Sequence, residues 1–172
     1  MAEGDGVPIG AAVSDGATFE EFFEALASTL FRRLYLITGD RGEAEEIMQD
    51  AFIVLFERWD RVQLMDDPEG YLYRVAFNIQ RKLRRKASVA ARRSLRIAPP
   101  ADDFDVVDTR SVVSSALAAL TPRQRAALVL TELLGYPSDE AAVIMNVRPS
   151  TVRVLAHQGR TAMRKQLGGA DE

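Results

Sequence analysis

The chain has 172 residues, a formal net charge of −3, a single histidine and no cysteine. This length suits one ordinary domain or two small ones. The lack of cysteine excludes disulfides and thiolate zinc sites, and one histidine leaves little for a metal site or a Ser-His-Asp arrangement. No apolar run approaches the roughly 18 residues of a membrane span, and the acidic first residues do not resemble a signal peptide. We therefore expect a cytoplasmic protein without direct membrane insertion. We expect no catalytic or metal site, no cofactor and no small-molecule substrate, and hence no enzyme.

The charges are distributed unevenly along the chain. Residues 1–70 contain 16 Asp and Glu against 5 Lys and Arg, whereas residues 71–96 contain 9 Lys and Arg and no acidic residue. A second stretch, residues 141–170, also lacks acidic residues. Two basic blocks in an acidic background indicate a nucleic-acid partner more strongly than the net charge argues against one.

The first predicted helices follow a Gly-, Ala- and Asp-rich start. Residues 1–17 have a composition typical of disorder. Thr18-Phe19-Glu20-Glu21 has the pattern of a capping box, which predicts a helix from there to about Ile37, ended by Gly39. Asp40 is the expected cap of the next helix, which should end near Trp59.

That second helix has an apolar stripe and an acidic stripe. The apolar stripe consists of Ala44, Ile47, Met48, Ala51 and Leu55. The other carries Glu46, Gln49, Asp50 and Glu57, interrupted by Ile53, with Phe52 nearby and both expected to be exposed. The acidic stripe is either a solvated face or a docking ridge for a basic partner. Apolar groups among charges favour docking.

The third predicted helix begins at Pro68 after a loop from Asp60 to Asp67, with Asp67 as its cap. Its polar face carries Arg74, Asn78, Arg81 and Arg85, and aromatic residues are interleaved at Tyr71, Tyr73 and Phe77. Arginines hold phosphates and aromatic rings stack on unpaired bases, so this pattern suits single-stranded nucleic acid. The alternative is that the rings belong to the core and the basic side chains are merely solvated.

A change of composition at residues 97–110 indicates a linker, because this segment contains two adjacent prolines and four aspartates. Residues 111–120 then predict a short apolar helix. Thr121-Pro122-Arg123-Gln124 combines a capping box with proline at the first helical position, so another helix should begin there and end at Gly135.

The last predicted elements are two helices separated by a tight turn. Ser138 is the expected cap of the short first helix, Asn146-Val147-Arg148 forms the turn, and Pro149 begins the longer second helix. One side of that helix is apolar, with Val152, Leu155, Ala156, Gly159 and Met163, and the other carries Arg153, His157, Arg160 and Arg164. This pattern matches a helix-turn-helix whose second helix enters the major groove. The alternative is a packing unit with a solvated basic face.

These motifs, in this order, resemble the extracytoplasmic-function (group 4) sigma factors of the sigma-70 family. LYLITGDRGEAEEIMQDAFIVLFERWDRV and DPEGYLYRVAFNIQRKLRR are similar to the family's sigma-2 domain, and ALAALTPRQRAALVLTELLGYPSDEAAVIMNVRPSTVRVLAHQGRTAMRK is similar to its sigma-4 domain. The resemblance covers about residues 19–167. It implies an all-α protein with a sigma-2-like helical bundle at residues 18–94, a flexible linker at 95–110 and a sigma-4-like helix-turn-helix domain at 111–168.

The resemblance also implies partners and site residues. The partners are promoter DNA and core RNA polymerase, which such proteins contact at the clamp helices of the β′ subunit and the flap of the β subunit. The clamp-docking residues would be Glu46, Gln49 and Asp50. The melted −10 element would be held by Arg74, Asn78, Arg81, Arg84 and Arg85. The −35 element would be contacted by Arg148, Ser150, Thr151, Arg153, Val154, His157, Gln158, Arg160 and Arg164, with Arg160 and Arg164 at phosphates and Arg153 reading a guanine edge.

Two residues depart from the family pattern. Lys82 stands where the family often has Asp, and Arg148 stands where Ser or Thr commonly caps the recognition helix, a task its side chain cannot perform. An alternative function is a stand-alone helix-turn-helix regulator that binds duplex DNA as a dimer. Members of this group are often held inactive by an anti-sigma factor, and the sequence leaves open whether one exists for this chain.

Overall fold

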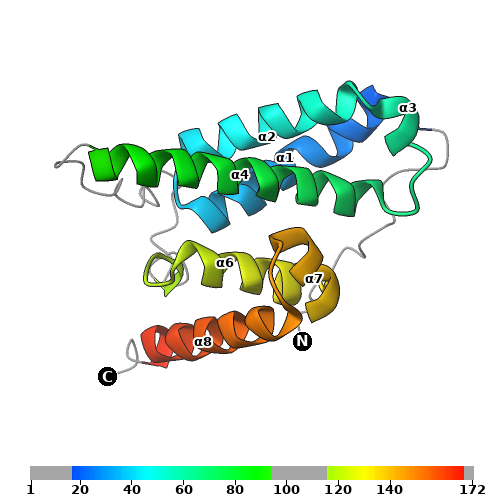
Figure 1. The fold of residues 1–172 in the computed structure, drawn as a ribbon. Coiled ribbons are helices and arrows are strands. Elements are labelled where there is room, and N and C mark those ends of the chain that lie inside the picture. Colours follow the sequence, from blue (N-terminus) through cyan, green and yellow to red (C-terminus); the bar gives the residue numbers. More distant parts are fainter. Residues whose placement is uncertain (1–16, 94–115, 169–172) are drawn as a thin grey trace.

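A computed structural model of the chain describes residues 17–93 and 116–168, and all the regular elements in those ranges are helices. They fall into two groups, α1, α2, α3 and α4 above and α6, α7 and α8 below (Figure 1). The all-α prediction is confirmed, and no helix in the described ranges has the length and hydropathy of a membrane span. The predicted linker at 95–110 and all but the last residue of the predicted disordered start at 1–17 lie outside the described residues. The helices of the first group are α1 (Phe19–Thr38), α2 (Arg41–Phe56), α3 (Trp59–Val62) and α4 (Pro68–Arg93).

The ends of the first two helices follow the predicted capping chemistry. The backbone N–H of Glu21 donates to Thr18 Oγ1 at 3.3 Å, and Glu21 Oε2 accepts from the Thr18 N–H at 2.9 Å. Gly39 ends α1 in the left-handed conformation, with a φ of 74°. The Asp40 carboxylate then accepts the Glu43 N–H at 2.6 Å and begins α2. These side chains satisfy backbone groups that the helix ends leave unpaired.

The segment between α2 and α4 is more structured than predicted. Helix α2 ends at Phe56 rather than near Trp59, and a separate single-turn helix, α3, follows at Trp59–Val62. Asp67 caps α4 as expected, with its Oδ1 accepting the Gly70 N–H at 2.8 Å. A Cβ at Gly70 would lie 1.9 Å from the Asp67 carboxylate, so any other residue at that position would force the Asp67 side chain to shift.

The core of the first group lies between α1, α2 and α4. Its largest fully buried side chains are Phe22, Leu30, Leu34, Ile37, Ile47, Leu55, Val62, Leu72 and Tyr73. Phe52 is only 3% exposed and packs edge-on against Phe23, with ring centroids 4.8 Å apart. The prediction that Phe52 is exposed was therefore wrong, because its ring completes an aromatic cluster with Phe19, Phe22 and Phe23.

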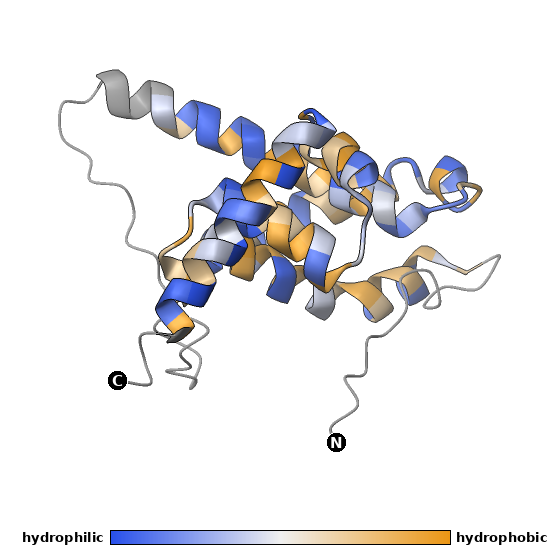
Figure 2. Ribbon diagram, turned by 90° about the horizontal axis from the view of Figure 1, so that it is seen from below, coloured by the Kyte–Doolittle hydropathy of each residue, from blue (hydrophilic) through white to orange (hydrophobic). Residues whose placement is uncertain are grey.

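The second group consists of α6 (Pro122–Leu128), the π-helical turn η1 (Val129–Leu133), α7 (Ser138–Met145) and α8 (Pro149–Gly168). The capping box of Thr121 and Gln124 is present as predicted. Helix α8 packs so closely on α6 that a Cβ at Gly159 would lie 2.8 Å from Leu128 Cδ1. In Figure 2 hydrophilic residues predominate in the coloured part of the carboxyl half of α4.

Two details of the second group differ from the predictions. Ser138 does not cap α7: it is the first helical residue, and the cap position is Pro137, which offers no side-chain hydrogen bond. Of the predicted helix at residues 111–120, the described part is helical only at 116–118, where Ala116 and Leu117 are buried. Asn146 ends α7 in the left-handed conformation, with a φ of 53°, and so forms the predicted turn.

The two groups pack against each other through one buried arginine and a pair of tyrosines. Arg125 on α6 is 1% exposed, and its Nε donates to the carbonyl of Ile37 at 2.9 Å, while its Nη2 donates to that of Thr38 at 3.2 Å. Tyr73 of α4 meets Tyr136 edge-on, with ring centroids 6.4 Å apart. The first and second groups therefore share a core.

Candidate nucleic-acid interface

The acidic stripe of α2 lies on the surface. Glu46, Gln49 and Asp50 are all exposed, as the helical periodicity predicts. Ile53, one turn further along, is 56% exposed, and Phe56 at the end of the helix is 61% exposed. Carboxylates next to unburied aliphatic and aromatic side chains are a composition that suits a protein partner better than bulk water.

The basic face of α4 is exposed as well. Arg74, Arg81, Arg84 and Arg85 reach solvent, and the half-buried Asn78 accepts a hydrogen bond from Arg81 Nη2 at 3.0 Å. Arg84 Nε lies 4.0 Å from the carboxylate of Glu43 on α2. Burial raises the pKa of Glu43, and the neighbouring Arg84 opposes that rise. The face therefore offers several cationic donors, of which only Arg84 has a nearby carboxylate among the described residues.

Two of the three aromatic residues of α4 belong to the core and do not form a stacking platform. Tyr73 is 2% exposed and Phe77 is 7% exposed, because both lie on the side of α4 that packs against other helices. The Tyr73 hydroxyl is hydrogen-bonded to Arg33 of α1, and burial raises its pKa to about 12. Only Tyr71 is half-buried, with its hydroxyl 3.3 Å from Arg58 Nη1. Of the two alternatives that the sequence left open, the structure therefore supports a core position for Tyr73 and Phe77.

Helix α8 presents the predicted recognition residues at its surface. Exposed are Arg148, Ser150, Arg153, Val154, His157, Gln158, Arg160 and Arg164, while Thr151 is half-buried. The opposite side of α8 is buried at Val152, Ala156 and Gly159. The helix begins at Pro149, as predicted, and the Arg148 carbonyl accepts the Thr151 N–H at 2.9 Å.

Two of these side chains already have partners within the second group. Arg160 Nη1 lies 2.5 Å from Glu132 Oε1, an exposed ion pair between α8 and η1. Gln158 Oε1 accepts from Gln124 Nε2 of α6 at 3.4 Å. Arg153, His157 and Arg164 form no hydrogen bond or ion pair through their side chains to any other described side chain, and they remain available to an incoming ligand.

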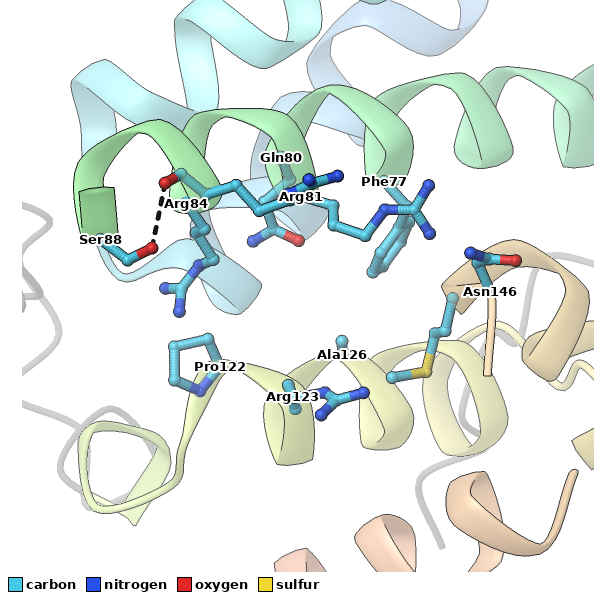
Figure 3. A pocket seen from close by; sticks show the side chains of 11 residues that line it. Phe77, Gln80, Arg81, Arg84, Ser88, Pro122, Arg123, Ala126 and Asn146 are labelled. Carbon is cyan, nitrogen blue, oxygen red and sulfur yellow. Dashed lines mark hydrogen bonds between the residues drawn. The ribbon is translucent and has the colours of Figure 1, made fainter. Parts of the chain in front are cut away.

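The structure also brings part of the α4 basic face against the second group. Arg81, Arg84 and Arg85 line a cleft of about 280 Å³, whose other wall includes Arg123 of α6 (Figure 3). Arg74 does not line this cleft. The predicted −10 residues are therefore divided between an open surface and a cleft between the two groups.

Sequence reasoning missed the residues that join the two groups. The burial of Arg125 was not predicted. Its spacing could have indicated it, because Arg125 stands three and four positions before the buried Leu128 and Val129 and so lies on the apolar side of α6. A charged residue in that position is a signal that it is buried with partners. Arg123 and Gln80 also line the cleft. The sequence gives no signal for this position, because it depends on how α4 and α6 pack against each other.

Two family models match the chain. Sigma-70 region 2 covers residues 22–89, and sigma-70 region 4 covers residues 110–163. The chain is 28% identical to the ECF RNA polymerase sigma factor SigE of Mycolicibacterium smegmatis over 93% of this chain and 68% of the relative. It is 25% identical to the ECF RNA polymerase sigma factor SigW of Bacillus subtilis over 89% of this chain and 90% of the relative.

A solved structure has the same fold. The sigma factor RpoE of Bartonella quintana, in its complex with the anti-sigma factor NepR, superimposes with a TM-score of 0.70 at 18% identity, over 87% of this chain and 96% of that chain. Regions 2 and 4 follow each other here in the order that the sequence motifs predicted. The chain therefore belongs to the extracytoplasmic-function sigma factors of the sigma-70 family.

Proposed function

We propose that this protein binds core RNA polymerase in the cytoplasm and directs it to one class of promoters through a −10 and a −35 element. The observation that carries the proposal is the presence, in one chain, of an exposed acidic ridge on α2 and two separate basic helices, α4 and α8. A duplex-binding regulator needs only the last of these. A promoter-recognition subunit needs all of them.

The ridge on α2 would dock on the β′ clamp helices of the polymerase. Its residues Glu46, Gln49 and Asp50 are exposed, and the carboxylates of Glu46 and Asp50 form no ion pair with other described residues, so both are free for a basic partner. Ile53 would add apolar contact area beside them. Acidic groups of this kind steer association and set specificity for the partner.

The basic helices would hold the promoter. Helix α8 would lie in the major groove of the −35 element, with Arg153 at a base edge and Arg164 at phosphate. The arginines of α4 would hold the melted −10 strand. Three of them, Arg81, Arg84 and Arg85, line the cleft between the groups, so we infer that the groups separate before the strand is held there.

Charge reversal on the ridge tests this function. Asp50→Arg should abolish binding to core polymerase and leave the free energy of unfolding unchanged, because the side chain is exposed. Glu24→Arg on α1 is the matched control, since Glu24 is also exposed and acidic but lies outside the ridge. If Asp50→Arg bound core polymerase as tightly as the control, a stand-alone helix-turn-helix regulator would be the better account.

A further inference from the structure

The cleft between the two groups has the charge of an anion site. Four of its lining side chains are arginines, three from α4 and Arg123 from the first turn of α6, and none is acidic. Arg85 and Arg123 form no ion pair within the described residues. Arg84 is 4.0 Å from Glu43, which leaves most of its donors unused. Like charges that line one cleft repel each other, so this arrangement favours an occupant with negative charge.

A buried hydrogen-bond donor faces the same cleft. Gln80 is 7% exposed, yet its Nε2 has no hydrogen-bond partner among the described residues. Figure 3 shows its side chain on the side of α4 that faces α6. A buried amide N–H without an acceptor is costly, and such groups usually have a partner. An oxygen atom of a bound ligand would supply that acceptor.

The rest of the cleft wall is mainly apolar, with Ser88 and Asn146 as its remaining polar residues. Phe77, Pro122, Ala126 and Met145 line it between the arginines. A site with a cationic rim and an aromatic, thioether-containing wall suits a ligand that has both an anionic end and a flat apolar part. At about 280 Å³ the cleft is at the small end of ligand sites, which excludes a strand of several nucleotides.

We propose that this cleft binds a free mononucleotide carrying a polyphosphate. The phosphates contact the guanidinium groups of Arg81, Arg84 and Arg123, and the Gln80 amide donates to an oxygen. The base lies against Phe77 and Met145. Because the ligand touches α4 and α6 at once, it favours the packed arrangement of the two groups over a separated one.

This site has a consequence for promoter binding that rests on the proposed function. Arg81 and Arg84 would serve both the nucleotide and the melted −10 strand, so the two ligands compete. Nucleotide binding itself does not depend on that role. A direct binding measurement therefore tests the site even if the assignment of the −10 residues fails.

The experiment is a titration of the full chain with a fluorescent ATP analogue at fixed ionic strength, with ATP, pyrophosphate and adenosine as unlabelled competitors. We expect saturable binding, with ATP competing better than pyrophosphate and adenosine competing weakly. Arg123→Ala and Gln80→Met should each raise the Kd on the order of tenfold, because each removes a donor to the ligand. Arg61→Ala, which removes an exposed arginine of α3 outside the cleft, should leave the Kd unchanged.

Three results would overturn the proposal. The first is no saturable binding up to millimolar nucleotide. The second is an equal loss of affinity in Arg123→Ala and Arg61→Ala, which would show that only general positive charge matters. The third is competition by pyrophosphate as strong as by ATP, which would mean that the apolar wall contacts no base. Unfolding curves of each variant separate lost binding from lost structure.

Discussion

The guanidinium group of Arg125 on α6 donates through its Nε to the backbone carbonyl of Ile37 on α1, at 2.9 Å. Its Nη2 reaches the next carbonyl, that of Thr38, at 3.2 Å, and its Nη1 reaches that of Leu117 at 3.3 Å. The last carbonyls of a helix have no partner within it, and a cation there also meets the negative end of the helix dipole. One buried side chain of the second group thus completes a helix of the first.

Replacing this arginine should weaken the packing of the two groups. Arg125→Met keeps a long apolar side chain but leaves buried carbonyls without donors, so we expect the free energy of unfolding to fall by about 2–3 kcal/mol. Urea denaturation of the wild-type protein and the variant measures this difference in the free energy of unfolding. Arg123→Met, two residues earlier on the same helix and exposed, is the control and should change stability by no more than about 0.5 kcal/mol. Equal effects of the two changes would contradict the role of Arg125.

A phenylalanine at position 136 should stabilise the folded protein more than the native tyrosine does. The side chain is 6% exposed, and the hydroxyl has no hydrogen-bond partner among the described residues. Tyr136→Phe should therefore raise the free energy of unfolding by about 1 kcal/mol. Tyr71→Phe removes a hydroxyl that is bonded to Arg58 and should give no gain. A loss of stability in Tyr136→Phe would show that its hydroxyl has a partner after all.

Tyr136→Phe should also change how the free energy of unfolding depends on pH under alkaline conditions. Burial raises the pKa of Tyr136 above its usual value of 10.0. Above pH 10 the unfolded chain releases this proton while the folded chain keeps it, so the folded state loses stability as the pH rises. Tyr136→Phe should make the stability curve flatter above pH 10. Identical slopes in the wild-type protein and the variant would contradict the assigned cause.

Arg153 should contribute to base selection at the −35 element. It is exposed on α8, and a guanidinium group can donate twice to a guanine edge. Arg153→Ala should cost on the order of 1–3 kcal/mol at the preferred site and relax specificity at one base pair. Arg164→Ala should instead weaken binding to all sequences alike. A uniform loss for Arg153→Ala across a randomised −35 library would make it a phosphate contact.

The sequence predicted the helices well because their ends depend on local chemistry. The caps at Thr18, Asp40 and Asp67 and the left-handed Gly39 involve residues within four positions of each other, so their pattern is visible in one dimension. The exposure of the α2 and α8 surface residues followed from helical periodicity for the same reason. The start of α7 was predicted one residue too late. Ser138 has the side chain of a typical cap, but it is the first helical residue, and Pro137 occupies the cap position.

Contacts between distant segments were not predictable in this way. The sequence left open whether Tyr73 and Phe77 stack on bases or belong to the core, because nothing nearby in the sequence shows that neighbouring helices cover them. The burial of Arg125 depends on the end of α1, 87 and 88 positions away. The cleft likewise exists only because α4 and α6 face each other across it.

The measurement that tests the central claim most directly is purification of core RNA polymerase with and without this protein, followed by in vitro transcription from a promoter library. The sigma factor account predicts that the protein co-elutes with core polymerase. It also predicts that initiation becomes selective for promoters sharing a −35 and a −10 element. Binding to duplex DNA without co-elution would contradict it, and the roles given to α2 and α4 would have to be abandoned.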